Sequence, residues 1–192
     1  MRGDHYSSPL NPLLRKAPNG IARSAYAVEI NPWARKGEIE ATLLFRGTII
    51  SAFGYIETRL GDLAIRCSRL DQYAALRDSF PHSTEKRVAF LRRAFALAPL
   101  VPYQRYATLF LNRVEQAAGL RHMVAHSRMQ VLPNWGVTFH DIPKAGPGSI
   151  TKRSHRLTLD QLELEAWKSA RLSRLCQTLM DRLDAAGVVP LE

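Results

Sequence analysis

Residues 38–70 read EIEATLLFRGTIISAFGYIETRLGDLAIRCSRL, and this stretch decides the fold class. Its apolar residues recur at spacings of three, four and seven, which stacks them along one face of a helix. The main stripe consists of Ile39, Leu43, Ile50, Phe53, Leu60, Ala64 and Cys67. A second set of apolar residues widens this face and consists of Leu44, Ile49, Ile56 and Leu63. We therefore predict one long helix that packs against more than one neighbour.

A second and a third helix are predicted after this segment. Ser83 is a suitable N-cap because its hydroxyl can accept a hydrogen bond from the first turn, and residues 84–97 have helical periodicity. Two prolines in the stretch 98–102 end that helix, because proline removes a backbone donor. The pattern from Tyr103 to Ser127 predicts the third helix, which we expect to loosen or kink at Gly119.

The last helix has both of its ends marked in the sequence. Thr158 and Gln161 have the spacing of a capping box, and Gly187 is a usual C-cap residue. The inner stripe of this helix consists of Leu162, Ala166, Ser169, Cys176, Leu179 and Leu183. Together the four segments predict a mainly α fold, a helical bundle of four to five helices.

Between the third and the last helix the pattern changes from helical to extended. Residues 137–142 alternate apolar and polar side chains, which is typical of a strand with one buried face. Residues 150–157 are a candidate second strand after a loop rich in Pro and Gly. We predict a small β-hairpin at about residues 130–157, inserted before the last helix.

The N-terminal region differs from the rest of the chain. Residues 1–37 are rich in Pro, Gly, Ser and Arg and show no sustained period. We expect an arm with little regular structure, apart from a short extended piece at Ala25–Ile30. Pro32 and Gly37 mark its end, so the helical domain is predicted to span residues 38–187.

The charge of the chain indicates a class of binding partner, and its cysteine content indicates a cellular compartment. The chain has 27 Lys and Arg against 17 Asp and Glu, and this net charge of +10 attracts polyanions, of which nucleic acid is the commonest. A solvated basic surface that only keeps the protein soluble is the plain alternative. Cys67 and Cys176 are isolated, no secretory signal is visible, and no uninterrupted apolar stretch is long enough to cross a bilayer. We therefore expect a cytoplasmic protein that does not enter membranes.

One short segment concentrates side chains that are suited to acid–base chemistry. Residues 120–127 read LRHMVAHS, which brings Arg121, His122 and His126 together within eight residues. Histidine titrates close to neutral pH, so it can accept or donate a proton under physiological conditions. Two kinds of chemistry are compatible with this segment.

The first kind is metal binding. His122 and His126 are four residues apart, a spacing at which zinc hydrolases of the HExxH type hold one ion. Those enzymes need a Glu directly after the first His as general base, and Met123 occupies that position. The fold would also have to supply a third ligand, for which the candidates are Glu57, His140 and His155.

The second kind is cleavage of RNA without a metal. RNA carries its own nucleophile, the 2′-OH, so a catalyst has to deprotonate it and stabilise charge on the phosphate. His suits the proton transfer, and the Arg fork suits the phosphate oxygens. Arg121 and His126 are about 140° apart around a regular helix, so their functional groups do not naturally converge. Either the helix rearranges near Gly119, or Arg121 reaches around it, or two copies of the segment meet across a dimer.

The run Arg121-His122-xxx-His126, at the end of an apolar-rich helix, resembles the Rx4–6H motif of the HEPN ribonuclease superfamily. In that superfamily a polar residue commonly follows the Arg, and His122 fits this pattern. The small Ser127 after the second His is similar to the usual end of the motif. The resemblance in sequence is confined to residues 120–127.

This resemblance implies a helical domain over roughly residues 38–185 that dimerises with its motifs facing each other in a basic cleft. It implies a metal-independent endoribonuclease, without a cofactor, that leaves a 2′,3′-cyclic phosphate and a 5′-OH. His126 would act as general base or acid, Arg121 would hold the phosphate, and His122 would orient them or assist the proton transfer. Many members are toxins or antiviral defence effectors, so an antitoxin or another regulatory protein is an expected partner.

Other polar residues are candidates for supporting such a site. Glu57 falls on the apolar stripe of the first helix, where a carboxylate is costly unless it is paired. It is either a structural ion pair or a rim position, or it orients a functional Arg or His. The basic residues predicted to bind RNA are Arg87, Arg92, Arg93, Arg128, Lys152 and Arg153.

Two further interpretations of the motif stay open. Arg and His near the end of a helix can cap carbonyls and favour the negative end of the helix dipole. A protein of this fold that does not cleave would be an RNA- or nucleotide-binding module, or an interaction subunit. Function resides in the site rather than in the fold, so the geometry of the motif is needed to distinguish these interpretations.

Overall fold

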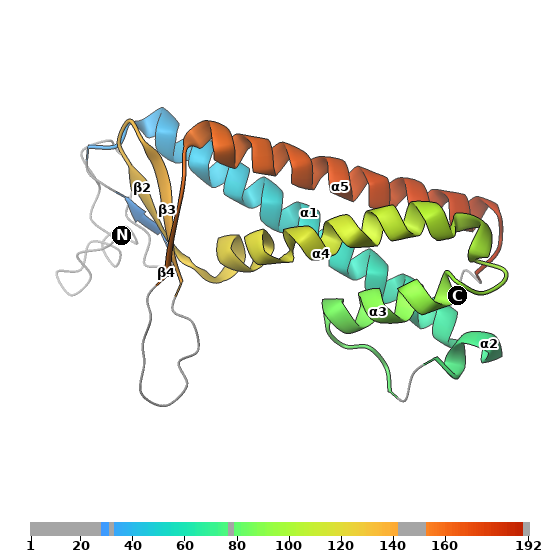
Figure 1. The fold of residues 1–192 in the computed structure, drawn as a ribbon. Coiled ribbons are helices and arrows are strands. Elements are labelled where there is room, and N and C mark those ends of the chain that lie inside the picture. Colours follow the sequence, from blue (N-terminus) through green and yellow to red (C-terminus); the bar gives the residue numbers. More distant parts are fainter. Residues whose placement is uncertain (1–27, 31–32, 77–78, 142–152, 190–192) are drawn as a thin grey trace, which may run out of the picture. The chain divides into compact units, whose positions relative to one another are not determined.

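The computed structural model describes residues 28–30, 33–76, 79–141 and 153–189 (Figure 1). Within these residues the chain forms five α-helices, one 3-10 helix and four short strands. The prediction of a mainly α fold with four to five helices is confirmed. Three of the described strands fall between the fourth and the fifth helix, where the hairpin was expected.

The chain divides into two compact units. The first unit comprises residues 1–50 and 120–167, and the second comprises residues 51–119 and 168–192. The helices that contribute a segment to each unit are α1 (Lys36–Ser68), α4 (Gln104–His126) and α5 (Leu159–Ala185). The predicted motif lies at the C-terminal end of α4 and therefore belongs to the first unit.

A four-stranded sheet belongs to the first unit (Figure 1). Its order is β1 (Val28–Ile30), β2 (Arg128–Leu132), β3 (Gly136–Asp141) and β4 (Arg153–Leu157). β1 pairs with β2 in parallel, whereas β2 with β3 and β3 with β4 are antiparallel.

The sheet is larger than the predicted hairpin. The pairing of β3 with β4 corresponds to the two predicted strands, but β2 and β1 extend the sheet on one side. β2 is too short for a clear periodic signal, because only Met129 and Val131 mark its buried face. β1 lies within the extended piece predicted at Ala25–Ile30, but it pairs with residues far along the chain, and no local pattern indicates that partner. Residues 150–152 of the predicted second strand lie outside the described residues.

The two faces of the sheet differ because successive side chains of a strand point to opposite faces. One face belongs to the core of the first unit, and its fully buried residues are Met129, Val131, Val137 and Phe139. The polar residues of the opposite face, which we call the polar sheet face, are Arg128, Gln130, Thr138, His140, Ser154 and Arg156. Leu132 lies on the same side, Thr138 is only 3% exposed, and Glu29 of β1 is paired with Gln130. The sheet therefore separates an apolar core from a hydrophilic surface.

The buried face of α1 differs in part from the predicted stripe. Five members of that stripe are buried as predicted: Ile39, Phe53, Leu60, Ala64 and Cys67. Leu43 and Ile50 are instead 40% and 41% exposed, and the neighbouring Thr42 and Ile49 are buried. A spacing of seven residues drifts by about 20° on a straight helix, so a strict heptad does not stay on one face.

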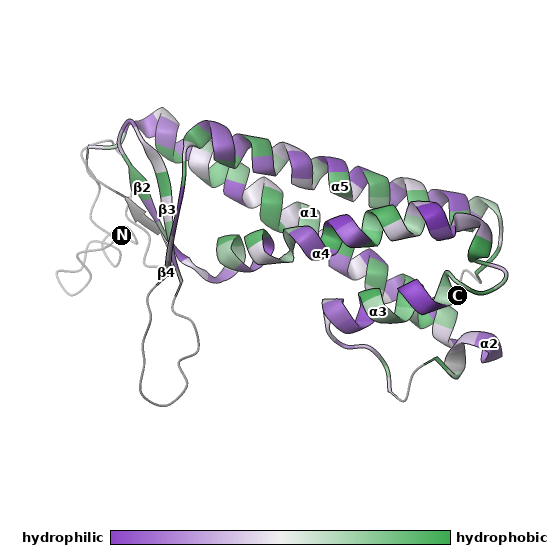
Figure 2. Cartoon of the chain, viewed as in Figure 1, coloured by the Kyte–Doolittle hydropathy of each residue, from purple (hydrophilic) through white to green (hydrophobic). Residues whose placement is uncertain are grey.

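The second unit is helical throughout its described residues. Besides its segments of α1, α4 and α5, it contains α2 (Asp71–Ala74), α3 (Thr84–Ala94) and the 3-10 helix η3 (Val101–Tyr103). Ser83 caps α3 as predicted, since its hydroxyl accepts a hydrogen bond from the Lys86 N–H at 3.2 Å. Apolar residues alternate with polar ones along these helices, as Figure 2 shows. The predicted inner residues of α3, namely Val88, Leu91 and Phe95, are fully buried.

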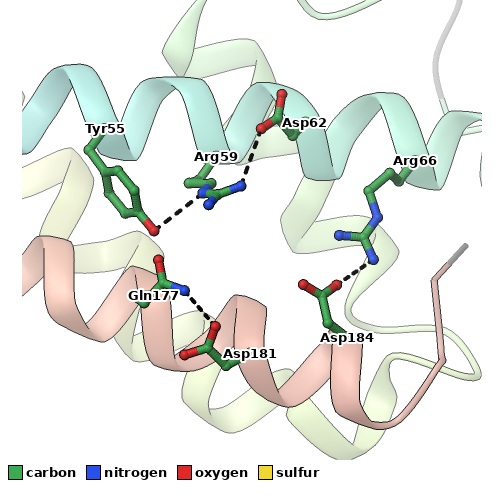
Figure 3. Close-up of polar contacts among 7 residues, drawn as sticks. All are labelled: Tyr55, Arg59, Asp62, Arg66, Gln177, Asp181 and Asp184. Atoms are coloured by element: carbon green, nitrogen blue, oxygen red, sulfur yellow. Dashed lines mark hydrogen bonds and ion pairs between the residues drawn. The ribbon is translucent and has the colours of Figure 1, made fainter. Parts of the chain in front are cut away.

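Arg66 ties the end of the chain to α1 within the second unit (Figure 3). One of its guanidinium nitrogens lies 2.6 Å from Asp184 Oδ1 and donates to the Val189 carbonyl at 3.0 Å. The Arg66 side chain is only 13% exposed, so the pair is screened less by solvent than a surface ion pair. Arg59, on the same helix, donates to the Tyr55 hydroxyl at 3.2 Å in a more exposed position.

The ends and the inner stripe of α5 follow the prediction. Thr158 Oγ1 accepts from the Gln161 N–H at 3.1 Å, and Gln161 Oε1 accepts from the Thr158 N–H at 2.9 Å. These reciprocal bonds form the predicted capping box. All six predicted inner residues of α5 are buried. Gly187 has a φ of +60°, the left-handed conformation that ends a helix.

Among the described residues, α1 is the one helix that is long and apolar enough to cross a membrane. The sequence contains no uninterrupted apolar stretch of that length, but the mean hydropathy of an 18-residue window in α1 reaches the value expected of a membrane-spanning helix. Length and composition alone decide this test, and 33% of the qualifying stretch of α1 is buried.

Both cysteines of the second unit are fully buried, and we expect them to resist thiol reagents. Burial raises the pKa of Cys67 and of Cys176 from 9.0 to about 12. The native protein should therefore react with a disulfide reagent at pH 8 only as fast as it unfolds, and denaturant should release two thiols. The unfolded chain ionises these thiols above about pH 9, so their contribution to stability is complete below pH 9 and falls as the pH rises toward 12. Immediate reaction of either thiol in native buffer would contradict this burial.

Candidate functional site

The predicted motif forms a compact cluster at the end of α4. Arg121 Nη1 lies 3.1 Å from His126 Nε2. The rings of His122 and His126 have centroids 5.0 Å apart and are tilted by 50°. Both histidines are exposed and Arg121 is half-buried, so the cluster is accessible to solvent. The structure thus brings together all three residues that the sequence singled out.

Arg121 meets His126 by reaching around the helix. α4 is continuous from Gln104 to His126, so the expected rearrangement at Gly119 does not occur. The contact forms within one chain and uses the length of the arginine side chain. Of the three arrangements expected from the sequence, this one is present in the structure.

The contact also limits which ring nitrogen of His126 can accept a hydrogen bond from Arg121. A guanidinium carries hydrogen-bond donors and no acceptor, so Nε2 of His126 has to present its lone pair. A hydrogen bond between these two nitrogens therefore needs the tautomer of His126 that carries its ring proton on Nδ1. A neutral imidazole can accept a proton through Nε2 once another partner engages the Arg121 guanidinium.

Arg46 of α1 fixes the last turn of α4. Its Nε donates to the Val124 carbonyl at 3.0 Å, and Val124 is one of the last four residues, whose carbonyls have no partner within a helix. Partial burial lowers the pKa of Arg46, which nevertheless stays protonated because arginine is a very strong base. Sequence reasoning missed this role. The available signal was a lone arginine in the most apolar part of the first helix.

Ser127 marks the passage from α4 into β2. It is 1% exposed, and its N–H donates to the Met123 carbonyl at 2.9 Å. Its hydroxyl is buried and has no hydrogen-bond partner among the described residues. Ser127 is the single residue between His126 and the first residue of β2. Because this position is buried, the small serine side chain fits there and a large one would not.

The predicted supporting residue Glu57 belongs to the second unit. There its carbonyl accepts a hydrogen bond from Arg87 at 3.1 Å, and its side chain is half-buried. Its role in orienting the motif stays a prediction. Among the described residues, no group of three or more His, Cys, Asp and Glu side chains is arranged to hold a metal ion. The metal interpretation of His122 and His126 therefore has no third protein ligand within those residues.

Two of the predicted RNA-binding residues are engaged in contacts within the second unit. Arg87 donates from Nε to the Pro81 carbonyl at 3.1 Å and from Nη1 to the Glu57 carbonyl. Arg92 forms an ion pair with Glu115. The observed contacts of both side chains are structural ones.

The other predicted RNA-binding residues lie in different parts of the chain, and only one of them is near the motif in sequence. Arg93 is exposed on α3, in the second unit. Arg128 is exposed at the start of β2, two residues after His126 and in the same unit. Lys152 and the side chain of Arg153 lie outside the described residues. Of this group, Arg128 is close to the motif in sequence, and it lies on the polar sheet face.

No family model, no curated protein and no solved structure matches this chain.

Proposed function

We propose that this chain is a metal-independent endoribonuclease of the HEPN type. The observation that carries the proposal is the 3.1 Å contact between Arg121 Nη1 and His126 Nε2. It supplies a proton acceptor and a phosphate-binding cation side by side at an accessible helix end. These are the two groups that cleavage of RNA by its own 2′-OH requires.

The proposed reaction begins when a substrate phosphate replaces His126 as the partner of Arg121. His126 Nε2 then takes the proton of the adjacent 2′-OH, and the 2′-oxygen forms a bond to phosphorus. The bond between phosphorus and the 5′-oxygen breaks, and the protonated imidazole returns its proton to that oxygen. The products are a 2′,3′-cyclic phosphate and a 5′-OH, so atoms and charge balance without a metal or a co-reactant.

The other groups of the cluster have supporting roles in this proposal. The Arg121 fork binds two phosphate oxygens and offsets the charge that accumulates on them as the new bond forms. His122, with its ring centroid 5.0 Å from that of His126, assists the proton transfer or orients the two principal residues.

The proposal extends to partners and location. The protein would act in the cytoplasm as a homodimer on RNA, as a toxin or antiviral defence effector controlled by an antitoxin or another regulatory protein. Three large apolar side chains of the first unit are well exposed, namely Leu44 (65%), Leu164 (53%) and Trp167 (61%). Their burial against a second copy would favour association.

The reaction class can be tested with one substrate pair. Purified protein is incubated in excess EDTA with a single-stranded RNA and with a DNA of the same sequence, and the product ends are identified by mass spectrometry. We expect cleavage of the RNA alone, with 2′,3′-cyclic phosphate and 5′-OH ends, because DNA lacks the nucleophile.

Two other outcomes would replace the proposal. Cleavage that stops in EDTA and returns with added zinc would assign the two histidines to a metal-dependent hydrolase. Tight binding of the RNA without any cleavage would assign the chain to the non-catalytic alternative, a binding module or an interaction subunit.

A further inference from the structure

The polar sheet face directly follows the motif in the chain. His126 ends α4, Ser127 makes the passage, and β2 begins at Arg128. Arg128 is paired across the sheet with His140, and His140 is paired with Ser154. The first row of the polar sheet face is therefore connected to the catalytic cluster by a single residue, and both lie in the same compact unit.

His140 gives this face an ordered set of hydrogen-bonding groups. Its Nδ1 lies 3.0 Å from Ser154 Oγ, and its Nε2 lies 3.3 Å from Gln130 Oε1. These three side chains come from β4, β3 and β2, so they link the strands on the side away from the core. Arginine, glutamine, histidine and serine side chains of this kind contact phosphates, sugars and base edges in complexes with nucleic acids.

The far end of the face carries an aromatic platform. Trp135, in the turn between β2 and β3, is 47% exposed. The guanidinium carbon of Arg156 lies 5.5 Å from the centre of the Trp135 ring, a cation–π contact. An exposed indole offers a flat surface on which an unpaired base can stack, and stacking of this kind tolerates any base.

The charged side chains on and around the polar sheet face determine where the phosphates of an anionic ligand can lie. The described members of the polar sheet face are two arginines, one histidine and three uncharged residues, and none is acidic. Carboxylates lie beside this face at two places: Glu29 of the edge strand β1 is paired with Gln130, and Glu38 and Asp160 line the pocket of about 330 Å³ next to Trp135. Glu38 is engaged there, because it accepts hydrogen bonds from the N–H groups of Arg35 and Asn134. Phosphates are therefore favoured next to Arg128 and Arg156, and the exposed part of the Trp135 ring is left for a base.

We infer that the polar sheet face binds the single-stranded RNA segment that adjoins the scissile phosphate, with one base stacked on Trp135. This inference rests on the proposed ribonuclease function, and it names the substrate as unpaired RNA. Arg128 and Arg156 hold phosphates of the bound strand. A duplex is excluded from this mode because its bases are already stacked on one another and present no free face to an indole.

The test measures binding separately from cleavage. A fluorescent single-stranded 2′-O-methyl RNA, which has no 2′-OH to react, is titrated with the full chain in EDTA, and fluorescence anisotropy gives the Kd. We expect Trp135→Ala to weaken binding by about 10-fold or more, and Trp135→Phe to keep most of the affinity. Arg156→Ala should lower the slope of log Kd against log salt by about 0.7, the value for one lost phosphate contact to a single strand.

Matched controls come from exposed residues outside the polar sheet face. Trp33→Ala removes an exposed tryptophan, and Arg105→Ala removes an exposed arginine of the second unit. Both should bind like the wild type, and thermal unfolding verifies that every variant is folded. Equal losses in the controls, unchanged binding by Trp135→Ala, or equal affinity for a duplex would overturn the inference.

The two proposals fail in different ways. Cleavage in EDTA with binding that is indifferent to Trp135 would overturn the role of the sheet face and leave the ribonuclease intact. RNA binding that depends on Trp135, in a protein that cleaves no RNA, would overturn the ribonuclease and leave the binding face. Binding of an acidic peptide in place of RNA would overturn both.

Discussion

Replacement of His126 by Ala is expected to lower kcat/KM for RNA cleavage by about 10²- to 10⁴-fold, the range for loss of a general base. The variant loses the only imidazole nitrogen that lies at 3.1 Å from the Arg121 guanidinium among the described residues. The fold should be unaffected, because His126 is exposed and ends its helix. The rate is measured in excess EDTA with a single-stranded RNA at concentrations below KM.

The control for this variant is His155→Ala. His155 is also exposed and belongs to the first unit, but it lies on β4, on the face of the sheet opposite to the polar sheet face. We expect it to cleave at the wild-type rate. Arg121→Ala should lose a similar factor, and the double variant with His126→Ala should lose little more than either, because the two residues act as a unit. Wild-type activity in His126→Ala would contradict the assignment.

Replacement of Gly136 by Ala is expected to lower the free energy of unfolding by about 3 kcal/mol, an estimate for strained backbone combined with a clash against neighbouring backbone. Gly136 has a φ of +133°, a conformation that residues with a Cβ rarely adopt. A Cβ there would lie 2.3 Å from the Leu157 carbonyl oxygen and 2.7 Å from Thr158 Cα, which are backbone atoms that cannot move aside alone. Urea unfolding followed by circular dichroism measures the loss.

The matched control is Gly119→Ala. Gly119 lies within α4, and a Cβ there would meet no atom within 4 Å. Because alanine is the better helix former, we expect this change to raise the free energy of unfolding by about 0.5–1 kcal/mol. A Gly136→Ala variant as stable as the wild type would show that the turn between β2 and β3 is not the one described.

Local chemistry explains which helices could be predicted from the sequence. The ends of α5 are set by hydrogen bonds between neighbours, as the Thr158 and Gln161 capping box illustrates, and such bonds leave a signature over four residues. The inner face of α5 was predicted correctly for the same reason, since its periodicity is fixed by the helix itself.

Tertiary packing explains what the sequence did not predict. α1 carries apolar residues on most of its surface, so periodicity alone does not tell which of them meet a neighbour, and Leu43 and Ile50 proved to be exposed. β1 is held by pairing with β2, a contact between residues far apart in the chain. Neither feature is encoded within a window of neighbouring residues.

The same distinction applies to the candidate site. Arg121, His122 and His126 lie on one helix, so their proximity followed from their spacing, although the route of the Arg121 side chain did not. Arg46 reaches the motif from another helix, and the polar sheet face depends on the register of three strands. These parts of the site appear only when the strands and helices are assembled.

The most direct test of the proposed function compares two proteins in one assay. Total cellular RNA is incubated in excess EDTA with the wild type and, side by side, with His126→Ala, and the ends of the products are analysed. We predict that the wild type alone degrades the RNA and leaves 2′,3′-cyclic phosphate ends. RNA that stays intact with both proteins, or is degraded equally by both, would contradict the assignment of the Arg121 and His126 pair as the catalytic centre.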